Sequence, residues 1–113
     1  MGKDIRLNNL DKFTIPHLVK MQAERLTSKP ALISESETLS FEDLDNFSTN
    51  IASHLIDRGV LPGDRAAIWA PNMNEWVLAA IAIHKAGGVV VPINTRMKGK
   101  EAAFILNNSE AKI

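Results

Sequence analysis

The sequence has 113 residues, of which 45% are hydrophobic, and its 13 basic side chains balance 13 acidic ones. A chain of this size forms one domain or one piece of a larger domain. The zero formal net charge argues against a nucleic-acid partner, because no basic excess is present to neutralise phosphates. The absence of cysteine excludes disulfides and thiolate chemistry.

The sequence also lacks the usual signals for export and membrane insertion. Residues 1–13 carry no apolar segment of the kind found in signal peptides. The longest apolar run, residues 76–83, is far too short to cross a bilayer. We therefore expect a cytoplasmic protein with no transmembrane segment.

The first predicted elements are a helix and a hairpin. After a polar lead-in over residues 1–13, Thr14 is a suitable N-cap for a helix that ends near Thr27. Residues 31–34 and 38–40 then form a short hairpin. The expected apolar face of the helix consists of Leu18, Val19, Met21, Ala23 and Leu26.

A second helix is predicted to follow the hairpin. Ser40 is a strong N-cap candidate with Asp43 at the third helical position, and Gly59 ends the helix. Negative charge is favoured in a first helical turn, so we interpret the nearby acidic group as capping residues rather than an acid–base cluster. That group consists of Glu42, Asp43 and Asp45. Residues 65–69 come next as a predicted buried strand.

The remaining elements alternate in the same way. Asn72 is expected to cap a third helix over residues 73–86, which is apolar on nearly all sides and therefore belongs inside a larger body. A glycine pair ends it, and residues 89–93 are predicted to be a fully buried strand. A fourth helix over 101–108 and the start of another strand in 110–113 complete the chain. Strands that alternate with helices predict an α/β fold with mostly parallel strands.

The glycine pair, Gly87 and Gly88, invites comparison with a phosphate-binding loop. Such loops run from strand to glycines to helix, so that the anion meets the positive N-terminal end of the helix. Here the order is helix, glycines, strand, which places the glycines at the negative C-terminal end. We therefore interpret the pair as a left-handed helix cap that turns the chain into a strand.

Few other residues suggest chemistry. His17, His54 and His84 are far apart, so we predict no metal site. Trp69 and Trp76 flank a predicted turn and are expected to pack in the core. No nucleophile motif or nucleotide loop is present.

A basic loop follows the strand predicted at 89–93. It carries Arg96, Lys98 and Lys100, just beyond the carboxyl end of a strand, where open α/β sheets bind ligands. Two alternatives stay open for this loop: an anion contact, or an ordinary solvated run of charge.

Three segments together resemble the N-terminal part of the adenylate-forming enzymes, which include acyl-CoA synthetases, peptide-synthetase adenylation domains and luciferases. They are LSFEDL (39–44), GVLPGDRAAIWAPN (59–72) and HKAGGVVVPIN (84–94), in the family's order and spacing. Asp43 stands where the family usually has Glu, and His84 replaces an apolar residue. The resemblance covers about residues 14–113.

The resemblance implies that residues 14–113 are an incomplete N-terminal portion of a large AMP-binding domain, a partial subdomain of that fold. It implies a parent acyl-CoA synthetase that uses ATP, Mg²⁺ and coenzyme A to convert a carboxylic acid into its CoA thioester through an acyl-adenylate. The phosphate loop and catalytic lysine of the family lie beyond residue 113. The chain alone is therefore expected to be inactive and to bind none of these groups tightly.

The loop PINTRMKG is more similar to the CoA ligases than to the peptide-synthetase domains. Arg96 is therefore the one site residue that the resemblance implies, as a contact to a coenzyme A phosphate, whereas Asn94 is expected to shape the loop. Two alternatives remain: another adenylate-forming enzyme with a different acceptor, or a non-catalytic α/β interaction module. Exposed apolar surface and open sheet edges also predict self-association of the isolated chain.

Overall fold

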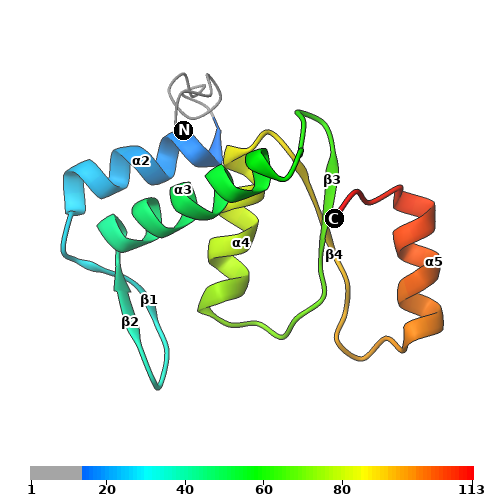
Figure 1. Cartoon of the computed structure of the whole chain (residues 1–113). Coiled ribbons are helices and arrows are strands. Elements are labelled where there is room, and N and C mark those ends of the chain that lie inside the picture. The colour runs from blue at the N-terminus through cyan, green and yellow to red at the C-terminus, as the bar shows by residue number, and fades with distance from the viewer. Residues whose placement is uncertain (1–13) are drawn as a thin grey trace.

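A computed structural model describes residues 14–113, so the lead-in predicted for residues 1–13 lies outside the described part. The chain has the predicted α/β class, with helices and strands in the predicted order (Figure 1). Its elements are α2 (Ile15–Leu26), β1 (Pro30–Ile33), β2 (Thr38–Ser40), α3 (Phe41–Asp57), β3 (Arg65–Ile68), α4 (Asn74–Lys85), β4 (Val89–Pro92) and α5 (Gly99–Ser109).

Local capping explains where the first helices begin. The Thr14 hydroxyl accepts a hydrogen bond from the N–H of His17 at the start of α2, as predicted. Strands β1 and β2 pair antiparallel and confirm the hairpin. At the start of α3, the Asp43 N–H donates to Ser40 Oγ at 3.0 Å, and the Ser40 N–H donates back to Asp43 Oδ2 at 3.1 Å. This reciprocal capping box satisfies two N–H groups that the helix itself leaves unpaired.

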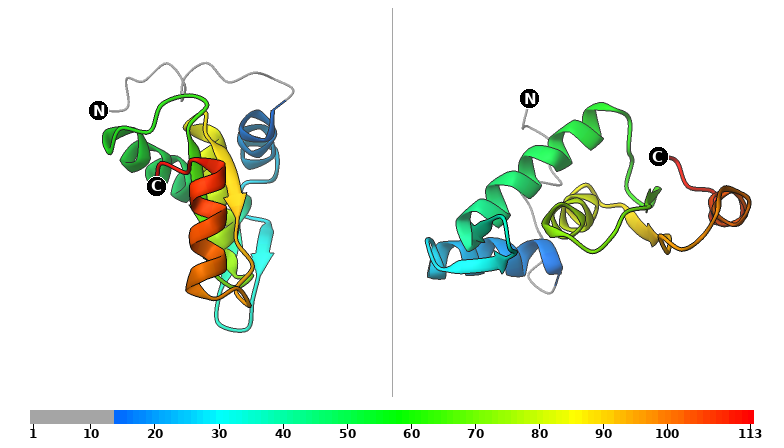
Figure 2. Two further views of the ribbon diagram at one scale, coloured as in Figure 1. Left: turned by 90° about the vertical axis from the view of Figure 1, so that its right-hand side faces the viewer. Right: turned by 90° about the horizontal axis from the view of Figure 1, so that it is seen from below.

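The second sheet has the predicted parallel geometry. Strand β3 pairs with β4, with Arg65 opposite Val89 and Ile68 opposite Pro92. Helix α4 connects the two strands on one side of the sheet, and α5 lies on the other side (Figures 1 and 2). The Lys112 N–H donates to the Arg65 carbonyl at 2.7 Å, and the Ile113 carbonyl accepts from the Ala67 N–H at 2.8 Å. The last residues therefore hydrogen-bond to β3 as a further strand would, in line with the strand start predicted at 110–113. They do not form a regular strand.

Helix α4 is the central element, as its apolar composition predicted. It packs against α2, α3, β3 and β4, and it contributes to both buried clusters. One cluster lies between the helices and the hairpin and contains Val19, Leu39, Leu44, Leu78 and Ile81. The other lies between α4 and the sheet and contains Ala66, Ile68 and Ile83. An all-apolar helix fits here because neighbours cover it on several sides.

A buried ion pair joins α3 to α4. Lys85 is only 3% exposed, and its Nζ donates to Asp45 Oδ1 at 2.6 Å, to the Asp45 carbonyl at 3.0 Å and to Thr49 Oγ1 at 2.7 Å. The three donors of an ammonium group are thus all used. This corrects the interpretation of Asp45 as a capping residue: it lies one turn into α3, too far from the helix start to cap it, and its carboxylate pairs with Lys85 instead.

The glycine pair closes α4 as expected. Gly87 has a φ of 82°, and its N–H donates to the His84 carbonyl, while the Gly88 N–H donates to the Ile83 carbonyl. These two bonds form a Schellman motif, which uses carbonyls that the helix end leaves unpaired. A side chain at Gly88 would meet Ile83 Cγ2 at 3.0 Å and the Asp64 carbonyl at 3.1 Å, so the second glycine also lets α4 approach the sheet.

Three predictions of burial were wrong. Strand β4 is not fully buried, since Val89 is 48% exposed, and Trp69 is 49% exposed rather than packed in the core. The physical reason is that α4 covers only one face of the sheet, and α5 makes only sparse contacts on the other. Leu18 and Met21 of α2 are also half-exposed, because only the side with Val19 and Ala23 meets the core.

Replacing Asp45 with alanine should destabilise the chain by about 3 kcal/mol, because the change leaves a buried ammonium group without its counterion. The free energy of unfolding in urea measures this effect. Asp57→Ala is the matched control, since Asp57 is exposed near the end of the same helix, and it should change stability by less than about 0.5 kcal/mol. Equal effects of the two substitutions would contradict a stabilising ion pair.

Lys85 should also make stability depend on pH. Burial lowers the pKa of Lys85 below its ordinary value of 10.5, although the hydrogen bond and charge of Asp45 oppose the shift. Between the lowered pKa and 10.5 the unfolded chain binds more protons than the folded chain, so stability rises with pH in that interval. The wild-type chain should therefore gain stability relative to Lys85→Met as the pH approaches 10.5. Parallel pH profiles in urea unfolding would refute this.

The isolated chain should self-associate through the uncovered sheet face. Trp69 and Val89 lie on the side of the sheet away from α4, and exposed apolar surface of this kind drives association. In analytical ultracentrifugation, the double change Trp69→Gln and Val89→Thr should reduce the associated fraction. Phe47→Gln, on the exposed side of α3, should leave that fraction unchanged. A wild-type chain that stays monomeric at every concentration tested would contradict the prediction.

Candidate binding site at the carboxyl ends of the parallel strands

The candidate site lies where β3 and β4 both end. Because the two strands are parallel, the loops that follow them meet at one edge of the sheet. Residues 69–73 lead from β3 into α4, and residues 93–98 lead from β4 into α5. Ile93 is anchored at this edge, since its N–H donates to the Ile68 carbonyl at 2.9 Å and its side chain is buried.

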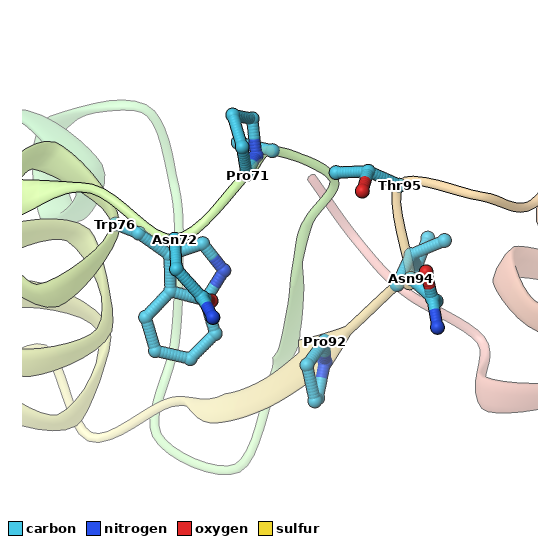
Figure 3. A pocket seen from close by; sticks show the side chains of 8 residues that line it. Pro71, Asn72, Trp76, Pro92, Asn94 and Thr95 are labelled. Atoms are coloured by element: carbon cyan, nitrogen blue, oxygen red, sulfur yellow. The ribbon is translucent and has the colours of Figure 1, made fainter.

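A pocket of about 460 Å³ opens between these two loops. Figure 3 shows Asn72 and Trp76 on the side of α4, and Pro92 and Asn94 on the side of β4. The lining consists of Ala70, Pro71, Asn72, Trp76, Pro92, Ile93, Asn94 and Thr95. It combines apolar rings with side-chain amides and a hydroxyl, and none of these eight side chains carries a charge.

The structure corrects the role predicted for Asn72. Helix α4 begins after Met73, whose side chain makes no capping hydrogen bond, so Asn72 is not the N-cap. Its side chain lines the pocket instead. Sequence reasoning missed Asn72, Trp76 and Thr95 as site residues. The available signal was the position of Asn72 and Thr95 just beyond the ends of two predicted parallel strands.

The basic loop is placed at the same edge but does not form the pocket wall. Arg96 is exposed and its side chain is not among the lining groups. Its N–H donates to Asn94 Oδ1 at 2.9 Å, so Asn94 shapes the loop as expected. Lys98 is exposed, whereas Lys100 borders a second, shallow apolar groove of about 490 Å³. That groove is lined by Met97, Lys100, Glu101, Phe104 and Ile105.

Within residues 14–113, no group of three or more histidine, cysteine or acidic side chains is arranged to hold a metal ion. His17, His54 and His84 lie on three different helices. No helix in the same range is long and apolar enough to span a membrane. Trp76 packs beside the second buried cluster, as predicted, while one side of it borders the pocket.

The arrangement can bind but supplies no reactive group of its own. The lining contains no acid, base or nucleophile that is activated by a neighbour, which general acid–base or covalent catalysis would require. Amide and hydroxyl groups over apolar walls are instead typical of sites that recognise part of a small molecule.

Comparison with known proteins then decides the family. The family model for AMP-binding enzymes matches residues 19–113, which is most of the chain. The chain belongs to the AMP-binding enzyme family. The adenylate-forming family that the sequence motifs suggested is thereby confirmed.

Curated relatives of this AMP-binding chain include both CoA ligases and peptide synthetases. A methyl-dioxo-octahydro-indenyl propanoyl:CoA ligase of Mycobacterium tuberculosis is 40% identical over 91% of the chain, which covers 20% of the relative. A plipastatin synthase of Bacillus subtilis is 32% identical over 88% of the chain, which covers 4% of the relative. The chain thus spans about one fifth of the length of the ligase and a much smaller share of the synthase.

Solved structures show the same fold. The O-succinylbenzoate coenzyme A synthetase of Bacillus subtilis aligns with a TM-score of 0.79 at 32% identity, covering 82% of this chain and 20% of that one. The N-terminal subdomain of Klebsiella oxytoca NpsA aligns with a TM-score of 0.82 over 87% of this chain and 25% of that one. Its identity is 22%, so this likeness supports the fold alone.

Proposed function

We propose that residues 14–113 form the N-terminal portion of the large AMP-binding domain of an acyl-CoA synthetase. The parent enzyme activates a carboxylic acid with ATP, releases pyrophosphate, and transfers the acyl group from AMP to the thiol of coenzyme A. The observation that carries this proposal is the 40% identity to a CoA ligase over 91% of the chain. The P-x-N-x-R form of residues 92–96 supports the same acceptor.

ATP and Mg²⁺ fit poorly on residues 14–113 alone. No strand-to-helix phosphate loop is present, the glycine pair closes a helix instead, and these residues contain no metal-binding cluster. We infer that the machinery for adenylation belongs to the rest of the parent protein. Arg96, exposed at the ligand edge of the sheet, is our candidate contact for a phosphate of coenzyme A.

The runner-up is an adenylation domain that delivers its acyl group to a carrier protein. The relation to the plipastatin synthase favours this alternative, since it reaches 32% identity over a similar share of the chain. The two functions share the first half-reaction and differ only in the acceptor thiol. A non-catalytic module would perform neither step.

The decisive assay uses the full-length parent protein, a panel of carboxylic acids, ATP and coenzyme A. We expect AMP release that requires both the acid and coenzyme A, with an acyl-CoA product visible by mass spectrometry. Acyl transfer only to a carrier protein would establish the runner-up, and the absence of acid-dependent ATP–pyrophosphate exchange would overturn both. The 113-residue chain should show no exchange.

Within the parent, Arg96→Ala should raise the KM for coenzyme A about fivefold, since an exposed charge-assisted contact to phosphate is worth about 1 kcal/mol. Acid-dependent pyrophosphate exchange should not change, because coenzyme A takes no part in adenylation. Lys98→Ala is the matched control in the same loop and should leave the KM for coenzyme A unaltered. An unchanged KM in Arg96→Ala would remove Arg96 from the site.

A further inference from the structure

Lys85 lies at the end of α4 opposite Trp76, and its side chain is not among the groups that line the pocket. We propose that Lys85 is nevertheless a positioning residue for this site. Through α4 it sets the place of the Trp76 wall, and through β4 it sets the place of the loop that carries Asn94 and Arg96. The geometric part of this inference is independent of any ligand, whereas its consequence for coenzyme A rests on the proposed function.

The faces of α3 and α4 that carry the ion pair also carry small side chains. On α3, Ser48 and Ala52 follow Asp45 at helical spacing, and on α4 Ala82 lies one turn before Lys85. Ser48, Ala52 and Ala82 are all completely buried. Side chains this small form shallow ridges that interlock weakly. The directional hydrogen bonds of Lys85 therefore favour one position of α4 along α3.

Helix α4 carries that constraint to the pocket. Its backbone hydrogen bonds hold it as one unit, so a displacement at Lys85 is also a displacement at Trp76, which lies in the first turn. Trp76 packs beside the second buried cluster and lines the pocket from the side of α4 (Figure 3). A shift of α4 along α3 would therefore change the width of the pocket directly.

The chain after α4 carries the same constraint to the other wall. A Cβ atom at Gly88 would lie 3.1 Å from the Asp64 carbonyl, so the end of α4 and the start of β3 are in close contact. Strand β4 follows immediately, and the Ile93 N–H bonds to β3 just beyond its end. The next residue, Asn94, accepts the Arg96 N–H and shapes the loop. A shift of α4 would thus also move this loop against β3.

NMR of the 113-residue chain tests the geometry. All variants carry the two substitutions that reduce self-association, which leave Trp76 as the single tryptophan. Lys85→Met should shift the Trp76 indole N–H signal and the backbone N–H signals of residues 93–96. Val19→Ala is the matched control, because it removes packing from the first buried cluster without touching the ion pair, and it should leave these signals in place.

Thr49→Val is a milder variant, because it removes one of the three acceptors of Lys85 and keeps the shape of the side chain. It should shift the same signals in the same direction by a smaller amount, and it keeps the test decisive if Lys85→Met does not fold. Unmoved signals in the folded variants, or equal shifts in Val19→Ala, would overturn the proposal and show that Lys85 contributes to stability alone.

In the full-length parent, the effect of Lys85 on coenzyme A should pass through the loop of Arg96. Arg96→Ala should raise the KM for coenzyme A about fivefold in the wild-type background but less than about twofold in Lys85→Met, because the effects of coupled residues are not additive. The same increase in both backgrounds would separate Lys85 from the loop and overturn the proposal. An unchanged KM in both backgrounds would refute the coenzyme A contact of the proposed function and leave the NMR result standing.

Discussion

The burial of one ammonium group, that of Lys85, constrains most of this structure. Removing a charge from water is costly unless its partners replace the lost hydration. Lys85 offsets part of that cost with three acceptors, all from α3: two oxygens of Asp45 and the hydroxyl of Thr49. A hydrophobic interface alone would tolerate small shifts of α4 along α3, whereas this set of bonds at 2.6–3.0 Å favours one relative position.

The position of α4 in turn determines the geometry of the edge where the two loops form the pocket. Lys85 is the last residue of α4, and after Ala86 the two glycines turn the chain within a single Schellman motif. The Gly87 carbonyl then accepts from the Gly63 N–H at 2.9 Å, and the Val89 N–H donates to the Asp64 carbonyl at 2.8 Å. Strand β4 therefore starts in a fixed register against β3, and the two loops that form the pocket meet because their strands end together.

Sequence reasoning recovered the parts that depend on local chemistry and missed those that depend on distant partners. The capping box at Ser40 and the cap at Gly87 were predictable because each involves residues within a few positions. The partner of Asp45 is 40 residues away, so only its nearness to a helix start was visible, and that suggested the wrong role. The prediction of burial failed for Trp69 and Val89 for a similar reason. An apolar run predicts that a face of a strand is covered, but it does not show which residues cover that face.

The parallel pairing of β3 and β4 places the pocket at the carboxyl edge of the sheet. Successive N–H groups of a strand point to opposite edges of that strand. The Ile93 N–H points toward β3, so position 92 points away from β3. The proline at that position has no N–H to donate to a further strand. Strand β4 is thus suited to an outer edge, while Arg65 and Ala67 already bond to the residues at 112–113 on the other side of β3. Helix α4 therefore leads the chain from β3 to β4 on one side of β3. Helix α5, on the opposite face of the sheet, leads the chain back to residues 112–113 on the other side of β3 (Figure 2). Open α/β sheets bind ligands where the chain reverses in this way, outside the carboxyl ends of the strands. The loop after β3 stands at that reversal, and it supplies Asn72 to the pocket.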